Sequence, residues 1–428
     1  MLPRLITMDA GETLMHRKTI AAAVIMIPFA FALANGIALA QDRPRAGAMI
    51  DQKLREAVER KDVPGVVALV TDRKGVIYQG AFGVADVATG RALAQDALFR
   101  IASMTKPVTS TAAMQLIEQG KLALEDPVEK YLPEMAKLPV FDSFDAKTGN
   151  YHLHISSKPI TVRHVLTHTS GLGYPFTSAT LRDFKPRASE DYPVGPLLFE
   201  PGERWHYGTS IDWLGRLIEA LSGRPLDEYF RLRIFEPLGM ADTFYNVPSD
   251  KQARLVAMHH RNSDGTIIKD EVQPPLNGDP IAGGTGLSST ASDYTRFVRM
   301  ILNDGQLDGA RILKADTIEA MGRNAIGAIG VRALKTASPQ ESRDFNFIAD
   351  GRDKWGLGFL ITVDQVPGKR SAGSLSWGGK YNTYFWIDRT RGIAGVMLTQ
   401  FLPFADREAL ALYDTFERGI YQVANATR

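Results

Sequence analysis

The sequence contains no cysteine. This absence excludes disulfide bonds, thiolate metal sites, a cysteine nucleophile and a lipid-modified N-terminal cysteine. A net charge is nearly absent as well, because 50 Lys and Arg residues oppose 48 Asp and Glu residues and leave +2. A chain with this balance has no global field for nucleic acid or anionic membranes, and we expect neither as a partner.

Motifs of several enzyme classes are also missing. The chain has no G-x-S-x-G, which excludes the nucleophile elbow of α/β-hydrolases, and it has no H-E-x-x-H and no P-loop. His164 and His168 have the i, i+4 spacing of a metal pair, but no acidic residue lies between them to act as a base. Their apolar neighbours indicate a packed helix. We therefore expect neither a metal nor a cofactor.

A long apolar run occurs only near the N-terminus, over residues 19–40. The basic His16-Arg17-Lys18 precedes it and the small-x-small sequence Ala38-Leu39-Ala40 ends it, an order typical of a secretory signal peptide. A membrane anchor is the alternative, because about 20 apolar residues span a bilayer, but Asn35 within the run disfavours it. We expect residues 1–40 to be a Sec-type signal peptide. The mature chain, 41–428, would be periplasmic or secreted in a bacterium, with no stable membrane anchor.

Hydrophobic residues amount to 44% and charged residues to 23% of the chain, as in ordinary globular proteins. Runs rich in β-branched and aromatic residues predict a hairpin over 65–84 and late strands at 355–363, 381–388 and 393–401. Apolar residues at helical spacing predict helices at 47–61, 106–119, 210–223 and 407–423. Strands at both chain ends favour an α/β (α+β) fold. About residues 47–125 and 284–428 would build one sheet, and about 126–283 would form an inserted helical subdomain.

Ser103-Met104-Thr105-Lys106 is the only S-x-x-K of the chain, and it lies where a strand-like segment passes into a helix. Residues three apart share one helix face, so serine Oγ and lysine Nζ can touch. A serine needs a base beside it to act as a nucleophile, and a lysine serves if burial or the positive helix end lowers its pKa. The free N–H groups of a helix start suit an oxyanion. The alternative is that Ser103 only caps the helix and Lys106 is solvated.

Two later segments supply further candidates. Tyr207 stands directly before the helix that Ser210 is expected to cap, where its hydroxyl could shuttle a proton between a lysine and a leaving group. A packed aromatic side chain is the alternative. Trp377-Gly378-Gly379-Lys380 precedes a strand, and its two glycines allow a ligand to approach the backbone closely. An ordinary glycine turn is the alternative there.

These three stretches, in this order, resemble the serine β-lactamase and penicillin-binding-protein superfamily, and most closely its class C-like branch with the family VIII carboxylesterases. Other stretches that resemble this branch are Val165–Leu172, Leu198–Gly202, Phe235–Met240 and Gly283–Leu287, so the resemblance covers about residues 50 to 420. It implies a β-lactamase/transpeptidase-like fold, in which an antiparallel sheet is flanked by helices and the site lies between the sheet and the helical subdomain.

The resemblance also implies roles for single residues. Ser103 would be the acylated nucleophile, Lys106 its base partner and Tyr207 the proton relay. The oxyanion hole would consist of the backbone N–H groups of Ser103 and Lys380, and Trp377, Gly378 and Gly379 would contact the substrate. Two departures from the class C pattern stand out. Thr209 replaces the asparagine of Tyr-x-Asn, and Trp377-Gly378-Gly379 replaces Lys-Thr-Gly, as in the esterases.

We therefore expect an exported serine hydrolase that cleaves small-molecule carboxylic esters, or amides, through an acyl-enzyme on Ser103. A class C-like β-lactamase and a D-Ala-D-Ala carboxypeptidase are the alternatives of the same class. A catalytically silent penicillin-binding-like module is the alternative outside it. A pure binding module, however, has no need of Ser103, Lys106 and Tyr207 together.

Overall fold

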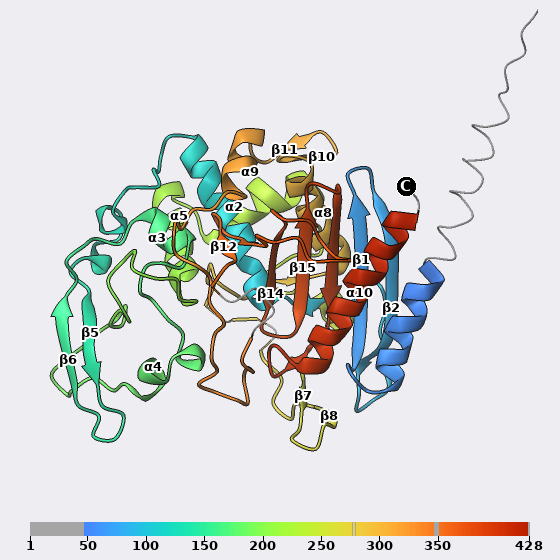
Figure 1. The fold of residues 1–428 in the computed structure, drawn as a ribbon, viewed down its shortest axis with the longest axis horizontal. Coiled ribbons are helices and arrows are strands. Elements are labelled where there is room, and N and C mark those ends of the chain that lie inside the picture. Colours follow the sequence, from blue (N-terminus) through green and yellow to red (C-terminus); the bar gives the residue numbers. More distant parts are fainter. Residues whose placement is uncertain (1–46, 276, 279, 346–350, 427–428) are drawn as a thin grey trace, which may run out of the picture. The chain divides into compact units, whose positions relative to one another are not determined.

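The computed structural model describes residues 47–275, 277–278, 280–345 and 351–426. The predicted signal peptide, residues 1–40, lies outside the described residues. Strands from the two ends of the described chain form one eight-stranded sheet (Figure 1). Its order is β12 (Lys354–Trp355), β13 (Leu360–Ile361), β14 (Leu375–Gly379), β15 (Thr383–Asp388), β16 (Ile393–Leu398), β1 (Gly65–Asp72), β2 (Val76–Asp86) and β3 (Arg91–Ala92).

Neighbouring strands of this sheet all pair antiparallel. The two chain ends meet where β1 pairs with β16, with Val67 opposite Leu398. β1 and β2 form the hairpin that the sequence predicts. The predicted fold class, an antiparallel sheet built by both chain ends and flanked by helices, is therefore confirmed.

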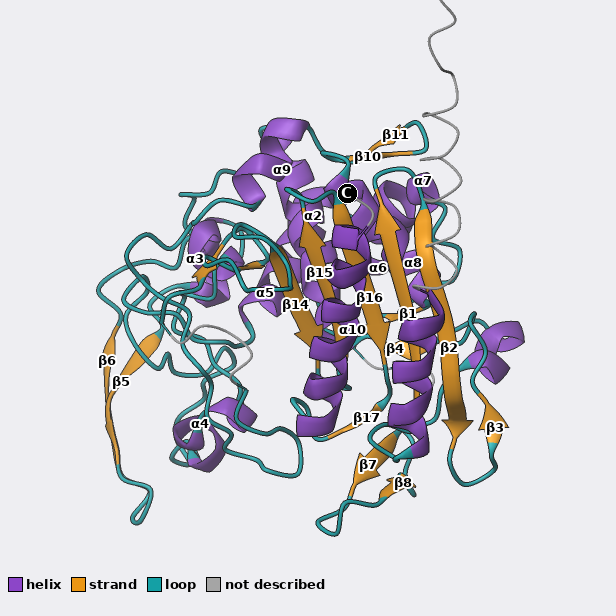
Figure 2. Cartoon of the chain, turned by 45° about the vertical axis from the view of Figure 1, so that its right-hand side comes forward, coloured by secondary structure: helices purple, strands orange, loops and turns teal. Residues whose placement is uncertain are grey.

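Helices cover both faces of the sheet, and the side chains of each strand alternate between them. α10 (Arg407–Ala426) and a helix over residues 47–59 cover one face (Figure 2). On this side the ring of Trp386 in β15 lies 5.5 Å from the ring of Phe416 in α10. α8 (Ala291–Leu302) covers the other face, where the ring of the preceding residue, Phe385, lies 5.5 Å from that of Tyr294.

Between its two sheet-forming ends the chain is not purely helical. Its helices are α2 (Thr105–Glu118), α3 (Val162–Leu166), α4 (Ala179–Asp183), α5 (Ser210–Ser222), α6 (Leu226–Phe230), α7 (Glu236–Leu238) and α9 (Ala315–Met321). Short strands accompany them in separate small sheets: β4 (Phe99–Arg100) with β9 (Ser288–Ser289), β5 (Pro139–Phe144) with β6 (Tyr151–Ile155), and β10 (Gln306–Leu307) with β11 (Ala310–Arg311). A three-stranded sheet holds β7 (His259–Arg261), β8 (Ile267–Lys269) and β17 (Phe401–Leu402).

Two local predictions need correction. The strand expected at 355–363 is a tight hairpin of β12 and β13, because Gly358 adopts a positive φ of 106° and Gly356 N–H donates to the Phe359 carbonyl at 2.8 Å. The expected N-cap Ser210 is instead the first residue of α5, and Thr209 holds the N-cap position. The end of α5 is as predicted, since Gly223 closes it in the left-handed conformation.

None of the helices in the described part of the chain combines the length and the apolar character that crossing a membrane requires.

Candidate active site

Ser103 and Lys106 lie at the junction between β4 and α2. Ser103 belongs to a short 3₁₀ turn, Ala102–Met104, and Lys106 to the first turn of α2. The structure brings the two side chains together, with Lys106 Nζ 3.2 Å from Ser103 Oγ. No side chain caps α2, and Lys106 is only 1% exposed. The alternative of a capping serine beside a solvated lysine is therefore wrong.

The backbone around Ser103 is constrained from both sides. Ala102 holds a left-handed φ of 44°, which is uncommon for a residue with a side chain and marks local strain. On the other side, Gly379 lies close to Ile101, the residue before Ala102. A Cβ atom on Gly379 would lie 2.2 Å from the Ile101 carbonyl oxygen. β14 thus runs against the segment that carries the serine, and Lys380 follows directly after it. An oxyanion hole of the Ser103 and Lys380 N–H groups stays a prediction.

Lys106 has two further partners that the sequence analysis missed. Its Nζ lies 3.1 Å from the hydroxyl of Tyr174 and 2.7 Å from the carbonyl oxygen of Gly284. Tyr174 in turn donates to Asp212 Oδ2 at 3.2 Å, and Gly284 N–H donates to Asp212 Oδ1 at 2.8 Å. Burial first, then the charge of Asp212, raises the pKa of Tyr174 well above its usual range. Tyr174 is therefore a neutral phenol at physiological pH.

Tyr207 lies beside the pair but contacts it differently from Tyr174. Lys106 Nζ stands 4.9 Å from the centre of the Tyr207 ring, a cation–π distance. The Tyr207 hydroxyl accepts a hydrogen bond from Trp377 Nε1 at 3.4 Å. Tyr207 is 3% exposed, so it is both packed and adjacent to the reacting pair. The role of proton relay stays a prediction.

The Trp377-Gly378-Gly379 stretch lies in β14. Trp377 is 3% exposed, and its ring packs against Tyr207 at 5.0 Å and Trp355 at 4.7 Å. A Cβ on Gly378 would lie 2.8 Å from the Tyr384 ring. Both glycines therefore serve close packing of the strand, and Trp377 touches the predicted proton relay. Their contact with substrate stays a prediction.

The ammonium group of Lys380 lies at the edge of the site and is ion-paired with a carboxylate. Its Nζ forms an ion pair with Glu341 and lies 5.5 Å from the ring centre of Phe176. Phe176 stacks on Tyr174, at 5.1 Å with an interplanar angle of 20°. The Lys380 ammonium thus contacts Phe176, and Phe176 stacks on Tyr174, whose hydroxyl contacts Lys106.

His168 packs against the aromatic side chains of this group. The expected helix, α3, ends at Leu166, and His168 follows it with a positive φ of 56°. Its ring packs 4.9 Å from Tyr207 and 5.2 Å from Trp355. Burial, with the charge of Lys106, holds the pKa of His168 well below its usual range, so the ring is neutral. His164 instead accepts from Thr161 N–H at the start of α3.

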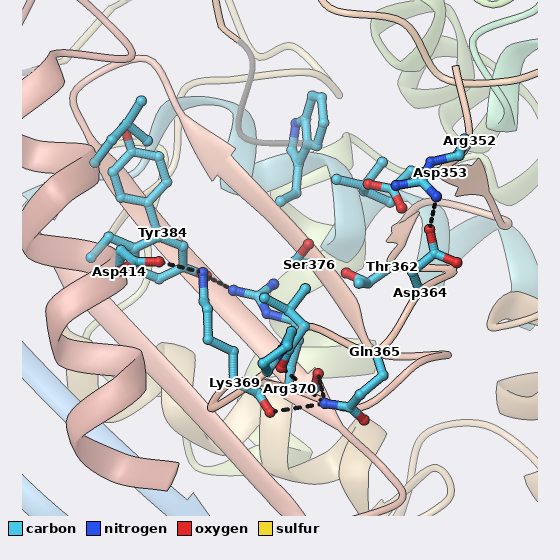
Figure 3. A pocket seen from close by; sticks show the side chains of 16 residues that line it. Arg352, Asp353, Thr362, Asp364, Gln365, Lys369, Arg370, Ser376, Tyr384 and Asp414 are labelled. Atoms are coloured by element: carbon cyan, nitrogen blue, oxygen red, sulfur yellow. Dashed lines mark hydrogen bonds and ion pairs between the residues drawn. The ribbon is translucent and has the colours of Figure 1, made fainter. Parts of the chain in front are cut away.

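Two cavities lie near β14 and the serine. One of about 550 Å³ is bounded by the loop before β14 and by α10, and charged side chains such as Lys369, Arg370 and Asp414 line it (Figure 3). Ser103, Lys106 and Tyr207 do not line that cavity. A second, of about 340 Å³, is bordered by Ala102, Thr285 and Gly286. Ser103, Lys106 and Tyr207 do not line this cavity either. Ala102 and Thr285, which border it, directly adjoin Ser103 and Gly284 in sequence, so the smaller cavity is the better candidate for substrate.

An antiparallel sheet flanked by helices, with a serine and a buried lysine three residues on at a helix start, is the arrangement of the β-lactamase/transpeptidase-like fold. The family model described as Beta-lactamase matches residues 50–417. The chain belongs to the beta-lactamase family.

Named relatives include both an esterase and an acyltransferase. Lovastatin esterase of Penicillium rubens is 31% identical over 400 residues, which are 88% of this chain and 99% of that protein. Monacolin J acid methylbutanoyltransferase of Aspergillus terreus is 31% identical over 398 residues, 87% of this chain and 95% of that protein. The solved structure of simvastatin synthase (LovD) from Aspergillus terreus, 28% identical, gives a TM-score of 0.77 and covers 88% of this chain and 98% of its own. The chain is thus an enzyme of the serine hydrolase and acyltransferase group.

Proposed function

We propose that the protein hydrolyses carboxylic esters of small molecules through an acyl-enzyme on Ser103. The observation that carries the proposal is the 3.2 Å approach of Lys106 Nζ to Ser103 Oγ in a buried setting. A serine hydroxyl becomes a competent nucleophile only with such a base beside it.

The reaction has two halves. In the first, Lys106 takes the Ser103 proton while Oγ forms a bond to the ester carbonyl carbon, and the Ser103 and Lys380 N–H groups hold the oxyanion. The bond to the leaving oxygen then breaks, and the alcohol receives a proton through Tyr207. In the second, water attacks the acyl-enzyme and gives a proton to Lys106, the bond from the acyl carbon to Oγ breaks with release of the carboxylic acid, and Lys106 returns the proton to Ser103 Oγ.

Acyl transfer to an alcohol is the second candidate, because the relative from Aspergillus terreus carries that activity in its name. It shares the first half-reaction and differs only in what attacks the acyl-enzyme. Adding a primary alcohol to an ester assay separates the two. An acyltransferase gives mainly the new ester, whereas a hydrolase continues to give mainly the free acid.

Hydrolysis of β-lactams is disfavoured by the side chains in β14. Trp377 and Gly378 stand where Lys-Thr-Gly would offer an ammonium and a hydroxyl to the carboxylate of a lactam. A charge-assisted hydrogen bond is worth about 1.5–3 kcal/mol, so its loss implies roughly 10–100-fold weaker recognition. We therefore expect kcat/KM for p-nitrophenyl butyrate to exceed that for nitrocefin.

The test of the proposal is covalent labelling. A fluorophosphonate should modify Ser103, as located by mass spectrometry, and Ser103→Ala should abolish both the label and ester hydrolysis. Ser110→Ala is the control, because Ser110 is a buried serine in α2, the helix that follows Ser103 and carries Lys106. Near-normal hydrolysis by a folded Ser103→Ala variant would rule the proposal out.

We also infer that residues 1–40 direct export and are removed. The support is the order of His16-Arg17-Lys18, the apolar run and Ala38-Leu39-Ala40. N-terminal sequencing of the protein from its host should find a terminus at Gln41 or within a few residues of it. Full-length protein in the cytosol would contradict this.

A further inference from the structure

The buried amine of Lys106 has three hydrogen-bonding directions, and the structure fills each of them. Nζ lies 3.2 Å from Ser103 Oγ, 3.1 Å from Tyr174 Oη and 2.7 Å from the Gly284 carbonyl oxygen. A protonated lysine donates in all three directions. A neutral lysine has two N–H bonds and one lone pair, so one of the three neighbours must face the lone pair. Only Ser103 gains reactivity from that position.

The hydrogen bonds to Asp212 determine which of the three neighbours faces the lone pair of Lys106. Its carboxylate accepts only, so the Tyr174 hydroxyl, 3.2 Å from Oδ2, must donate to it. The Tyr174 oxygen is then left as an acceptor for a Lys106 N–H. The Gly284 carbonyl accepts the second N–H, and Gly284 is held in place by its backbone N–H, on the other side of its Cα, which donates to Asp212 Oδ1 at 2.8 Å. The lone pair is left pointing at Ser103.

We propose that Asp212 is a positioning residue for the reaction at Ser103: by accepting from both Tyr174 and Gly284, it fixes the Tyr174 and Gly284 oxygens as acceptors for two N–H bonds of Lys106 and leaves the third direction of the amine for proton exchange with the serine hydroxyl. This inference rests on the proposed function. When the Ser103 proton moves to Lys106, the new ammonium donates to the same two acceptors without any rearrangement. The negative charge of Asp212, one hydroxyl away, favours the charge that has formed.

A structural role for Asp212 is the rival explanation, because an acidic residue in the first turn stabilises a helix. The chain offers a close match for separating the two. Asp212 is the third residue after the Thr209 N-cap of α5, and Asp293 is the third residue after the Thr290 N-cap of α8. Asp293 also accepts from one backbone N–H, that of Asp242, and from one hydroxyl, that of Thr243. It does not contact Lys106.

The experiment compares Asp212→Asn with Asp293→Asn in p-nitrophenyl butyrate hydrolysis. The Asp212 carboxylate accepts from the Tyr174 hydroxyl and from Gly284 N–H. In Asp212→Asn, one of these two donors faces the amide NH₂, which is itself a donor. We expect kcat to fall roughly 10–100-fold with KM nearly unchanged. We also expect the acid limb of the kcat/KM–pH profile to move to lower pH, because a negative charge near the base is lost. Asp293→Asn should change neither quantity.

Tyr174→Phe is the second variant, and it removes only a hydroxyl. It should lower kcat as Asp212→Asn does, and the double variant should be no slower than the slower single one, because both act through Lys106. Additive effects, or a folded Asp212→Asn variant that behaves like Asp293→Asn, would overturn the proposal. If Asp212→Asn does not fold, Tyr174→Phe decides alone: an unchanged kcat and pH profile overturn the proposal.

Labelling of the wild type keeps this test apart from that of the proposed function. If a fluorophosphonate does not modify Ser103 in the wild-type protein, the esterase assignment fails and the positioning role fails with it. If the wild type is labelled and active while the Asp212 and Tyr174 variants match their control, only the positioning role is wrong.

Discussion

The ammonium group of Lys380 is ion-paired with the carboxylate of Glu341 and lies over the ring of Phe176. Glu341 comes from a segment far from β14 in sequence, yet it neutralises a cation next to the predicted oxyanion hole. The Lys380 side chain is 30% exposed and that of Glu341 38%, so water and a ligand can reach the pair. The edge of the site is therefore close to neutral, which suits an uncharged ester better than a carboxylate.

Freeing that cation should change substrate preference. We expect Glu341→Gln to raise the ratio of kcat/KM for nitrocefin to that for p-nitrophenyl butyrate about 3–10-fold. The gain is below that of a buried charge-assisted bond because solvent screens a partly exposed lysine. Glu319→Gln is the control, since Glu319 pairs with Arg323 on α9. A ratio that stays constant or falls would show that Lys380 does not face the substrate.

The second prediction concerns the joint action of Ser103 and Lys106. Ser103→Ala should lower kcat by roughly 10³ or more, and Lys106→Met should be similarly severe, because the two act as one unit. The double variant should then be little slower than either single one. Steady-state kinetics with p-nitrophenyl butyrate measures this, and circular dichroism checks the fold. Losses that multiply in the double variant would mean that the two residues act independently.

The Ser103–Lys106 contact could be predicted from the sequence because it is local. Three residues of separation at the start of a helix bring the two side chains together whatever the rest of the fold does. The partners of Lys106 could not be predicted that way. Tyr174 and Gly284 reach Nζ from 68 and 178 residues away. Nothing in the sequence around Tyr174 separates it from any other packed tyrosine, since its hydroxyl is aimed by tertiary packing.

The same distinction explains the fold. The hairpin of β1 and β2 follows from runs of β-branched and apolar residues around a turn, and the helix α5 follows from helical spacing and a closing glycine, so local pattern predicts them. The direction of the Lys380 side chain was open in the sequence, because strand alternation around a turn is set by the pairing of β14 with β15. The break between β12 and β13 was missed because Gly356 and Gly358 were not interpreted as a turn.

The third prediction concerns a buried ion pair that ties α10 to the loop before β14. Arg370 Nε lies 2.7 Å from Glu417 Oε1, with side chains 8% and 0% exposed. Glu417→Leu should lower the free energy of unfolding by about 3–5 kcal/mol, because it leaves the Arg370 charge buried without a counter-charge. The Tyr413 hydroxyl, which accepts from Arg370 at 2.9 Å, is uncharged and does not replace it. Combining it with Arg370→Met should restore much of that loss. Urea unfolding measures both changes.

The exposed pair of Arg224 and Glu228 is the control for that measurement. Its side chains are 50% and 37% exposed, and an exposed ion pair of this kind contributes about 1 kcal/mol or less. If Glu417→Leu costs no more than Glu228→Leu, then the Arg370 charge is compensated by groups other than Glu417.

The last prediction concerns acid stability and two histidines of opposite behaviour. Burial, with the charge of Arg204 adding to it, lowers the pKa of His206 from 6.5 to about 4. The folded protein therefore binds fewer protons than the unfolded chain between these values, and stability falls as pH drops from 6.5 to about 4. The size of the effect is about 3 kcal/mol for a shift of this extent. His206→Phe, which preserves the ring beside Phe199, should flatten this part of the stability curve.

His154 should show the reverse, and it makes the test specific. Hydrogen bonds to Glu200 and then Asp142 raise the pKa of His154 above its usual value, so its contribution to stability is present at low pH and is lost as pH rises through the folded pKa. His154→Asn should thus steepen the loss of stability on acidification where His206→Phe reduces it. Urea unfolding of the three proteins at pH 7, 5.5 and 4 decides. Parallel stability curves for wild type and His206→Phe would mean that His206 is protonated equally in the folded and unfolded states.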